Sequence, residues 1–191
     1  MRAQDCGIYI LAAGRSERFG PRDKLTAPLG GKAILQHVIE TAAALPFARL
    51  SGVVPQSSTA RRRLLRAADL GVIENETPAR GLGSSLALGA KDAQRQSLKA
   101  MLILLGDMPF VQPQDLQGIL ALLEHHDKVI SYCNKIKLPP MAVRFNMFEP
   151  LAEIDPRQGA KVLFAGEDCA RYVLSSAAAR DIDRHADLRG L

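Results

Sequence analysis

Small residues and cations gather in one stretch of the chain, residues 11–24, directly after a run of apolar residues. Ala12, Ala13 and Gly14 have little or no side chain, so a ligand can lie against the backbone, whose amides bind phosphate oxygens well. Four cations follow within ten residues: Arg15, Arg18, Arg22 and Lys24. This combination is typical of a polyphosphate site, although the Gly-Lys-Ser/Thr sequence of a Walker A loop is absent.

A carboxylate follows the most apolar stretch of the chain. Asp107 comes after residues 100–105, in the sequence Leu-Gly-Asp-Met-Pro. Strand propensity does not favour aspartate there, whereas a carboxylate beside a phosphate-binding loop can hold Mg²⁺ against the phosphates. An Asx turn or a helix cap is the alternative role for this residue.

Two aspartates near the C-terminus, Asp181 and Asp183, are candidates for a second metal ligand. If residues 180–182 belong to a strand, side chains two positions apart share one face, and both carboxylates can approach the same ion. A solvated edge strand is the alternative.

A turn rich in glycine and serine opens a predicted helix. The sequence Gly-Leu-Gly-Ser-Ser-Leu over residues 81–86 places Gly83 and Ser84 at the helix start, where amides and hydroxyls bind anions and polar ligands. The same residue types also form an ordinary N-cap, and the sequence leaves both roles open.

The elements that must position these residues alternate regularly along the chain. Apolar runs predict strands at residues 7–12, 50–54, 71–73, 100–105 and 128–132, and helical patterns predict helices at 32–44, 60–70, 83–97 and 113–124. Such alternation predicts a Rossmann-like, three-layer α/β/α fold with a mostly parallel sheet. Ligands of such sheets bind beyond the carboxyl ends of the strands, where the loops singled out above would lie.

Beyond Cys133 the alternation changes. Residues 136–145 predict a strand with two prolines, 148–154 and 158–164 short helices, and 172–174 and 180–182 short strands. We expect a single domain over residues 1–191, in which residues 1–133 bind the ligand phosphates and residues 134–191 cover the mouth of the site.

Composition narrows the class of protein. The 191 residues are 47% hydrophobic and 24% charged, as in folded globular proteins. The three cysteines are widely spaced, which argues against a disulfide framework and a structural zinc site. No segment approaches the ~20 apolar residues of a membrane helix, and the acidic Asp5 does not suit a signal peptide. We expect a soluble cytoplasmic protein with no membrane partner.

Positive charge alone does not identify a partner. The net charge of +5 suits a triphosphate as well as a nucleic acid. Arg61, Arg62, Arg63 and Arg66 form a basic run without interleaved aromatic residues, so we predict a solvated helix face and no nucleic-acid partner.

Taken together, these segments resemble a known family. Four segments match the MobA-like nucleotidyltransferases in order and spacing. They are the loop of residues 11–24, the turns of residues 81–86 and 105–109, and the acidic tail of residues 181–188. Within that family the chain is most similar to the molybdenum-cofactor cytidylyltransferases. The resemblance implies a fold like that of nucleotide-diphospho-sugar transferases.

The resemblance also implies a reaction and residue roles. A nucleoside monophosphate passes from an NTP to a phosphate of the acceptor, a molybdopterin, and pyrophosphate leaves. Arg18 and Lys24 would hold the triphosphate, and Asp107 would bind Mg²⁺ with Asp183, or else Asp181, as second ligand. The nucleotide would lie between Leu11, Ala12, Ala13 and Gly14 on one side and Gly83 and Ser84 on the other.

CTP is the favoured donor. Guanylyl-transferring relatives usually carry Leu-Ala-Gly-Gly where this chain has Leu-Ala-Ala-Gly, and the methyl group of Ala13 crowds a purine more than a pyrimidine. The alternatives are a GTP donor, a sugar- or alcohol-phosphate acceptor, or a non-catalytic module that binds nucleotide or cofactor. A molybdopterin acceptor would imply contact with a molybdoenzyme or its chaperone.

Overall fold

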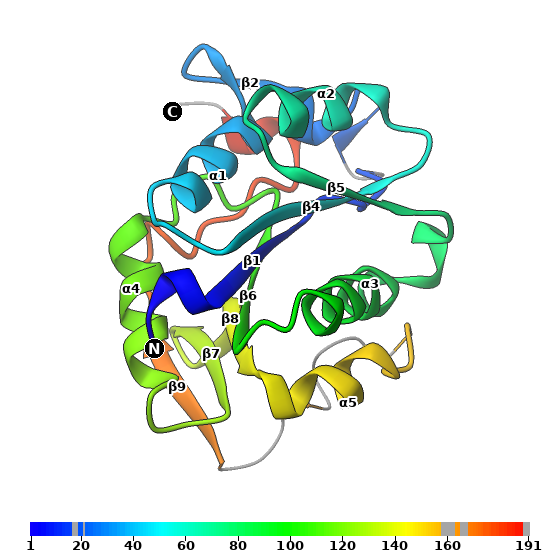
Figure 1. Ribbon diagram of the computed structural model, residues 1–191. Helices are drawn as coiled ribbons and strands as arrows, with labels where there is room; N and C mark the ends of the chain where they lie inside the picture. The colour runs from blue at the N-terminus through cyan, green and yellow to red at the C-terminus, as the bar shows by residue number, and fades with distance from the viewer. Residues whose placement is uncertain (17–18, 21, 158–162, 165–167, 189–191) are drawn as a thin grey trace.

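The centre of the molecule is one large β-sheet (Figure 1). A computed structural model describes residues 1–16, 19–20, 22–157, 163–164 and 168–188, and these contain a seven-stranded sheet of order β5-β4-β1-β6-β8-β7-β9. The strands are β1 Cys6–Leu11, β4 Arg49–Pro55, β5 Gly71–Asn75, β6 Ala100–Leu105, β7 Lys128–Cys133, β8 Ile136–Arg144 and β9 Cys169–Val173. A separate two-stranded ribbon pairs β2 Pro28–Leu29 with β3 Lys32–Ala33.

Within this sheet, β8 runs against its neighbours. β5, β4, β1 and β6 pair in parallel, as do β7 and β9, whereas β8 is antiparallel to both β6 and β7. The prediction of a mostly parallel sheet is confirmed. Pro139 and Pro140 fall where the register of β7 and β8 shifts, between the pairs Ile130–Met141 and Ser131–Leu138. Proline cannot donate to a ladder, so this irregularity is where a paired strand tolerates it.

Helices cover both faces of the sheet. α1 Ile34–Ala43, α2 Thr59–Ala67 and α4 Pro113–Leu122 pack on one face, and α3 Leu82–Arg95 and α5 Phe148–Ala152 on the other. The alternation of β1 shows why: Ile8 and Ile10 enter the core beneath α1, while Tyr9 and Leu11 enter the core beneath α3. The predicted three-layer α/β/α fold is therefore confirmed.

Short 3-10 turns supply the remaining elements. They are η1 Ala3–Asp5, η3 Lys24–Thr26, η4 Pro78–Arg80, η5 Phe145–Met147 and η7 His185–Leu188. Among the described residues, no helix has the length and apolar character needed to cross a membrane.

The predictions for the C-terminal third hold in part. The strand predicted at residues 172–174 corresponds to β9, which begins earlier, and the helix predicted at 158–164 falls largely outside the described residues. The strand predicted at residues 180–182 is wrong. There the backbone N–H of Ile182 donates to the carbonyl of Asp107 at 3.0 Å, and the Ile182 side chain is fully buried, so the segment is held by the turn after β6.

The pairing of β1 with β6 brings the chemistry-bearing loops together. The two strands are parallel neighbours, with Leu11 opposite Leu105 at their carboxyl ends. The chain therefore leaves both strands at the same edge of the sheet, where the N–H of Gly106, just before Asp107, donates to the carbonyl of Leu11 at 3.0 Å.

A glycine in β4 seats α2 against the sheet. A methyl group on Gly52 would lie 2.4 Å from one terminal carbon of Leu65 and 2.5 Å from the other. Leu65 is fully buried, so it has no free space into which it can move.

We predict that Gly52→Ala destabilises the protein by about 1–3 kcal/mol, because the added methyl overpacks a filled core. Chemical denaturation monitored by circular dichroism measures the change. Gly14→Ala is the matched control, because a methyl there meets nothing within 4 Å. Equal stability of the two variants would contradict the close packing of α2.

Candidate functional site

A cavity of about 600 Å³ opens at the carboxyl ends of β1 and β5. One wall comes from the loop after β1, a second from the segment that joins β5 to α3, and Asp183 closes one side. The lining residues are Leu11, Ala13, Gly14, Arg15, Ser16, Lys24, Pro78, Ala79, Gly81, Leu82, Ser85 and Asp183. The cavity thus contains much of the loop that the sequence marks as a polyphosphate site.

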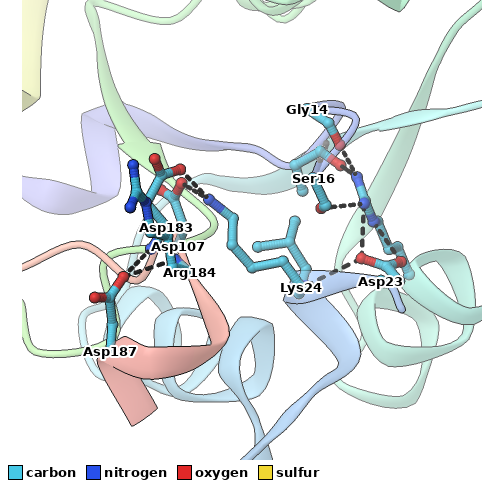
Figure 2. A network of polar contacts seen from close by, with 11 residues as sticks. Gly14, Ser16, Asp23, Lys24, Asp107, Asp183, Arg184 and Asp187 are labelled. Atoms are coloured by element: carbon cyan, nitrogen blue, oxygen red, sulfur yellow. Dashed lines mark hydrogen bonds and ion pairs between the residues drawn. The ribbon is translucent and has the colours of Figure 1, made fainter. Parts of the chain in front are cut away.

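Lys24 is a buried cation held between two carboxylates. Its side chain is 9% exposed, and its Nζ lies 2.7 Å from Oδ2 of Asp107 and 3.3 Å from Oδ1 of Asp183 (Figure 2). Moving an ammonium group out of water is costly unless anions and hydrogen-bond acceptors replace the water, and these two carboxylates do so. The structure therefore brings together three of the residues predicted to act in the site.

The two carboxylates come from distant parts of the chain. Asp107 follows β6, and Asp183 lies in the C-terminal tail just before η7. Two backbone contacts shape that tail: the N–H groups of Asp183 and Arg184 both donate to Oδ2 of Asp187, at 2.9 and 2.6 Å. This turn directs the Asp183 side chain towards Lys24.

The Asp107 carboxylate has the chemistry of a metal ligand. Its Oδ1 atom is buried and meets no hydrogen-bond donor among the described residues. Those residues contain no cluster of three or more His, Cys, Asp or Glu that could hold a metal by itself. Mg²⁺ characteristically binds through one or two carboxylates plus substrate phosphates, so Asp107 with Asp183 fits this ion when a polyphosphate completes the set.

Asp181 stands apart from Asp183. It lines a second cavity of about 480 Å³, which also contains Leu105, Met108 and Arg180. Loss of surrounding water raises the pKa of Asp181, and the nearby Asp107 carboxylate raises it further. Asp183 contacts Lys24 in the structure, which favours it over Asp181 as the partner of Asp107.

Arg61 is buried against the loop after β1, a contact that the sequence prediction missed. We predicted a solvated helix face for the basic run of α2, yet Arg61 is 4% exposed. Its guanidinium group donates to the carbonyls of Ala12 and Gly14, to Oγ of Ser16 and to both carboxylate oxygens of Asp23. The prediction is correct only for Arg63 and Arg66, which are exposed, while the partly buried Arg62 pairs with Glu74 at 2.6 Å.

The start of α3 contributes different residues from those predicted. Gly81, Leu82 and Ser85 line the first cavity, whereas Ser84 lines another hollow together with Arg80. Ser84 Oγ donates to the carbonyl of Gly81 at 2.7 Å. A methyl group on Gly83 would lie 2.7 Å from Cα of Pro156, so this glycine allows a close backbone approach. A nucleotide contact by Gly83 or Ser84 stays a prediction.

The other predicted residues of the loop lie as follows. Leu11, Ala13 and Gly14 line the cavity. Ala12 is buried, is not among the residues that line the cavity, and donates its backbone N–H to the carbonyl of Val53 at 2.8 Å. Arg18 lies outside the described residues.

Comparison with known proteins identifies the family. A model of the MobA-like NTP transferase domain matches residues 8–173, which is most of the chain. The chain belongs to the MobA-like NTP transferase family.

Curated relatives of this MobA-like chain are longer proteins. The bifunctional protein GlmU of Solibacter usitatus is 33% identical over 124 residues, which cover 62% of this chain and 25% of the relative. The chain spans about a quarter of the length of the curated relatives that it matches first.

Solved structures share the fold of this MobA-like chain. Rv0371c of Mycobacterium tuberculosis H37Rv superposes with a TM-score of 0.82 and 22% identity, covering 99% of this chain and 97% of its own. A complex of Rv0371c with manganese gives a TM-score of 0.77 and 21% identity, covering 96% of each chain. Molybdopterin-guanine dinucleotide biosynthesis protein A of Archaeoglobus fulgidus gives 0.72 and 16%, covering 96% of this chain and 95% of its own.

We predict that Lys24→Met lowers the free energy of unfolding by about 1–3 kcal/mol, because it leaves two carboxylates without their shared cation. Mg²⁺ should raise the melting temperature of this variant more than that of the wild type, since the ion takes over the neutralising role. Differential scanning calorimetry with and without Mg²⁺ measures both effects.

Lys32→Met is the control for this experiment. Lys32 forms an exposed pair with Glu40 at 2.8 Å, and exposed pairs contribute little to stability. An equal response of Lys24→Met and wild-type protein to Mg²⁺ would contradict binding of the ion by Asp107 and Asp183.

Proposed function

We propose that this protein is a Mg²⁺-dependent nucleotidyltransferase that moves CMP from CTP to a phosphate of molybdopterin, or of the molybdenum cofactor, and releases pyrophosphate. One observation carries the proposal: the cation of Lys24 lies between the carboxylates of Asp107 and Asp183, beside a cavity lined by the backbone of the glycine-containing loop. Membership of the MobA-like NTP transferase family supports it.

The chemistry needs placement and charge neutralisation more than a protein nucleophile. An oxygen of the acceptor phosphate forms a bond to the α-phosphorus of the NTP. The bond from that phosphorus to the bridging oxygen breaks, and its electron pair leaves with pyrophosphate. Lys24 and Arg18 would bind the triphosphate and neutralise the leaving group. Mg²⁺ held by Asp107 and Asp183 would supply a second positive charge against the phosphate oxygens.

Two cavities are lined by residues that contact Asp107 or lie close to it in the sequence, which suits a reaction between two substrates. The first cavity contains Lys24 and Asp183, whereas the second contains Leu105 and Met108, on either side of the turn. The second cavity also carries Arg180, a cation suited to an acceptor phosphate. We propose that the nucleotide binds in the first cavity and the pterin phosphate in the second.

The proposed donor is CTP, as the methyl group of Ala13 in the cavity wall leaves less room for a purine. In calorimetric titrations of CTP, GTP, ATP and UTP with Mg²⁺, we expect CTP to bind at least about tenfold more tightly than the others, or about 1.4 kcal/mol. Tighter binding of GTP would move the protein to guanylyl transfer. Failure of all four to bind would contradict the proposed function.

Asp107→Asn tests catalysis separately from binding. The amide keeps the shape of the side chain but loses the charge that holds the metal, so we expect kcat for pyrophosphate release, with CTP and molybdopterin, to fall about 100-fold or more. Asp168→Asn is the control, because Asp168 is 70% exposed and pairs with Lys128 at the start of β7, away from the site. An Asp107→Asn variant with wild-type kcat would contradict the metal role of Asp107. Wild-type protein that binds CTP without releasing pyrophosphate would favour a non-catalytic module.

A further inference from the structure

The guanidinium group of Arg61 has an acceptor for each of its five N–H groups. Nε donates to Oδ2 of Asp23 at 2.8 Å, and Nη2 donates to Oδ1 of Asp23 at 2.7 Å and to Oγ of Ser16 at 3.3 Å. Nη1 donates to the carbonyls of Ala12 at 2.6 Å and Gly14 at 2.8 Å. Every partner lies in the segment between β1 and η3. The side chain of one helix residue thus holds this loop at four positions.

The two carbonyl contacts determine where the loop amides point. In a planar trans peptide the C=O and N–H groups point in opposite directions. Because the carbonyls of Ala12 and Gly14 point at Arg61, the N–H groups of Ala13 and Arg15 point away from it. Ala13 and Arg15 both line the 600 Å³ cavity. Backbone N–H groups that face a cavity are suited to bind anions.

The contact between Arg61 and Asp23 also affects the position of Lys24. Asp23 Oδ1 also accepts from the backbone N–H of Leu25 at 3.0 Å, and so caps η3, whose first residue is Lys24. The carboxylate that neutralises Arg61 therefore sets the turn from which the Lys24 side chain reaches Asp107 and Asp183. Figure 2 shows Gly14, Ser16 and Asp23 on one side of Lys24 and the two carboxylates on the other.

We propose that Arg61 is a positioning residue for the phosphates of the nucleotide. Arg61 does not contact the phosphates, but orients the amides of Ala13 and Arg15, and the turn that begins at Lys24, towards them. The inference rests on the proposed function. Arg61 is unsuited to direct binding, because all five of its donors are already used and its charge is paired with Asp23. A lysine has a single point charge and cannot hold two carbonyls and a carboxylate in one plane.

The test compares Arg61→Gln and Arg61→Lys with Arg63→Gln, an exposed position on the same helix. Calorimetry measures the Kd of inorganic tripolyphosphate and of CTP, each with Mg²⁺, and steady-state assays measure KM and kcat. We expect both Arg61 variants to bind tripolyphosphate and CTP about tenfold or more weakly, with Arg63→Gln unchanged. That loss equals about one charge-assisted hydrogen bond.

The outcomes separate this inference from the proposed function. Folded Arg61→Gln protein with wild-type affinity would overturn the positioning role alone. Full rescue by Arg61→Lys would show that charge suffices, and would also overturn it. If wild-type protein binds neither tripolyphosphate nor any nucleotide, the proposed function fails and this inference fails with it.

A measurement on wild-type protein covers the case in which Arg61 variants do not fold. In a nuclear magnetic resonance titration with tripolyphosphate and Mg²⁺, we expect the amide signals of Ala13 and Arg15 to shift among the most of all backbone amides. Saturable binding that leaves both signals in place would overturn the inference.

Discussion

The site depends on the burial of one positive charge. Lys24 keeps its ammonium group in a largely water-free place only because two carboxylates surround it, one 83 and the other 159 residues along the chain. Three segments must therefore meet: the loop after β1, the turn after β6 and the C-terminal tail. The sheet brings the first two together through the pairing of β1 with β6, and the hydrogen bond from Ile182 to Asp107 attaches the third.

A second buried cation holds the same loop from its other side. Between β1 and η3 the described loop residues have little regular structure, so side-chain bonds must maintain its shape. Arg61 supplies them from α2, and α2 itself is seated by the contact of Leu65 with Gly52. A chain of contacts therefore runs from a glycine in β4 to the loop that lines the cavity. Each of the two buried cations is paired with a carboxylate, which offsets the cost of removing its charge from water.

The arrangement of the cavities follows from the sheet. Parallel strands release their loops at one edge, where the loop after β1 lines one hollow, and residues of β6 and of the antiparallel β8 line the other. One hollow has the backbone and cations that suit a polyphosphate, and the other combines apolar residues with Arg180 and Asp181. Asp107 contacts Lys24, which lines the first hollow, and Leu105 and Met108, close to Asp107 in the sequence, line the second.

The sequence by itself determined the layers and indicated the main candidate site residues, because both depend on local patterns. Apolar runs and helical periodicity predicted the alternating elements. Lys24 was visible as a cation of the loop after one apolar run, and Asp107 as a carboxylate after another. Only the tertiary structure decided that Ser85 rather than Ser84 faces the cavity, that residues 180–182 form no strand, and that Arg61 is buried. One signal for Arg61 was present, since it lies four residues before the buried Leu65 and so shares its helix face. That signal could not be recognised from the sequence, because the groups that accept hydrogen bonds from Arg61 belong to a loop some 40 residues earlier in the chain.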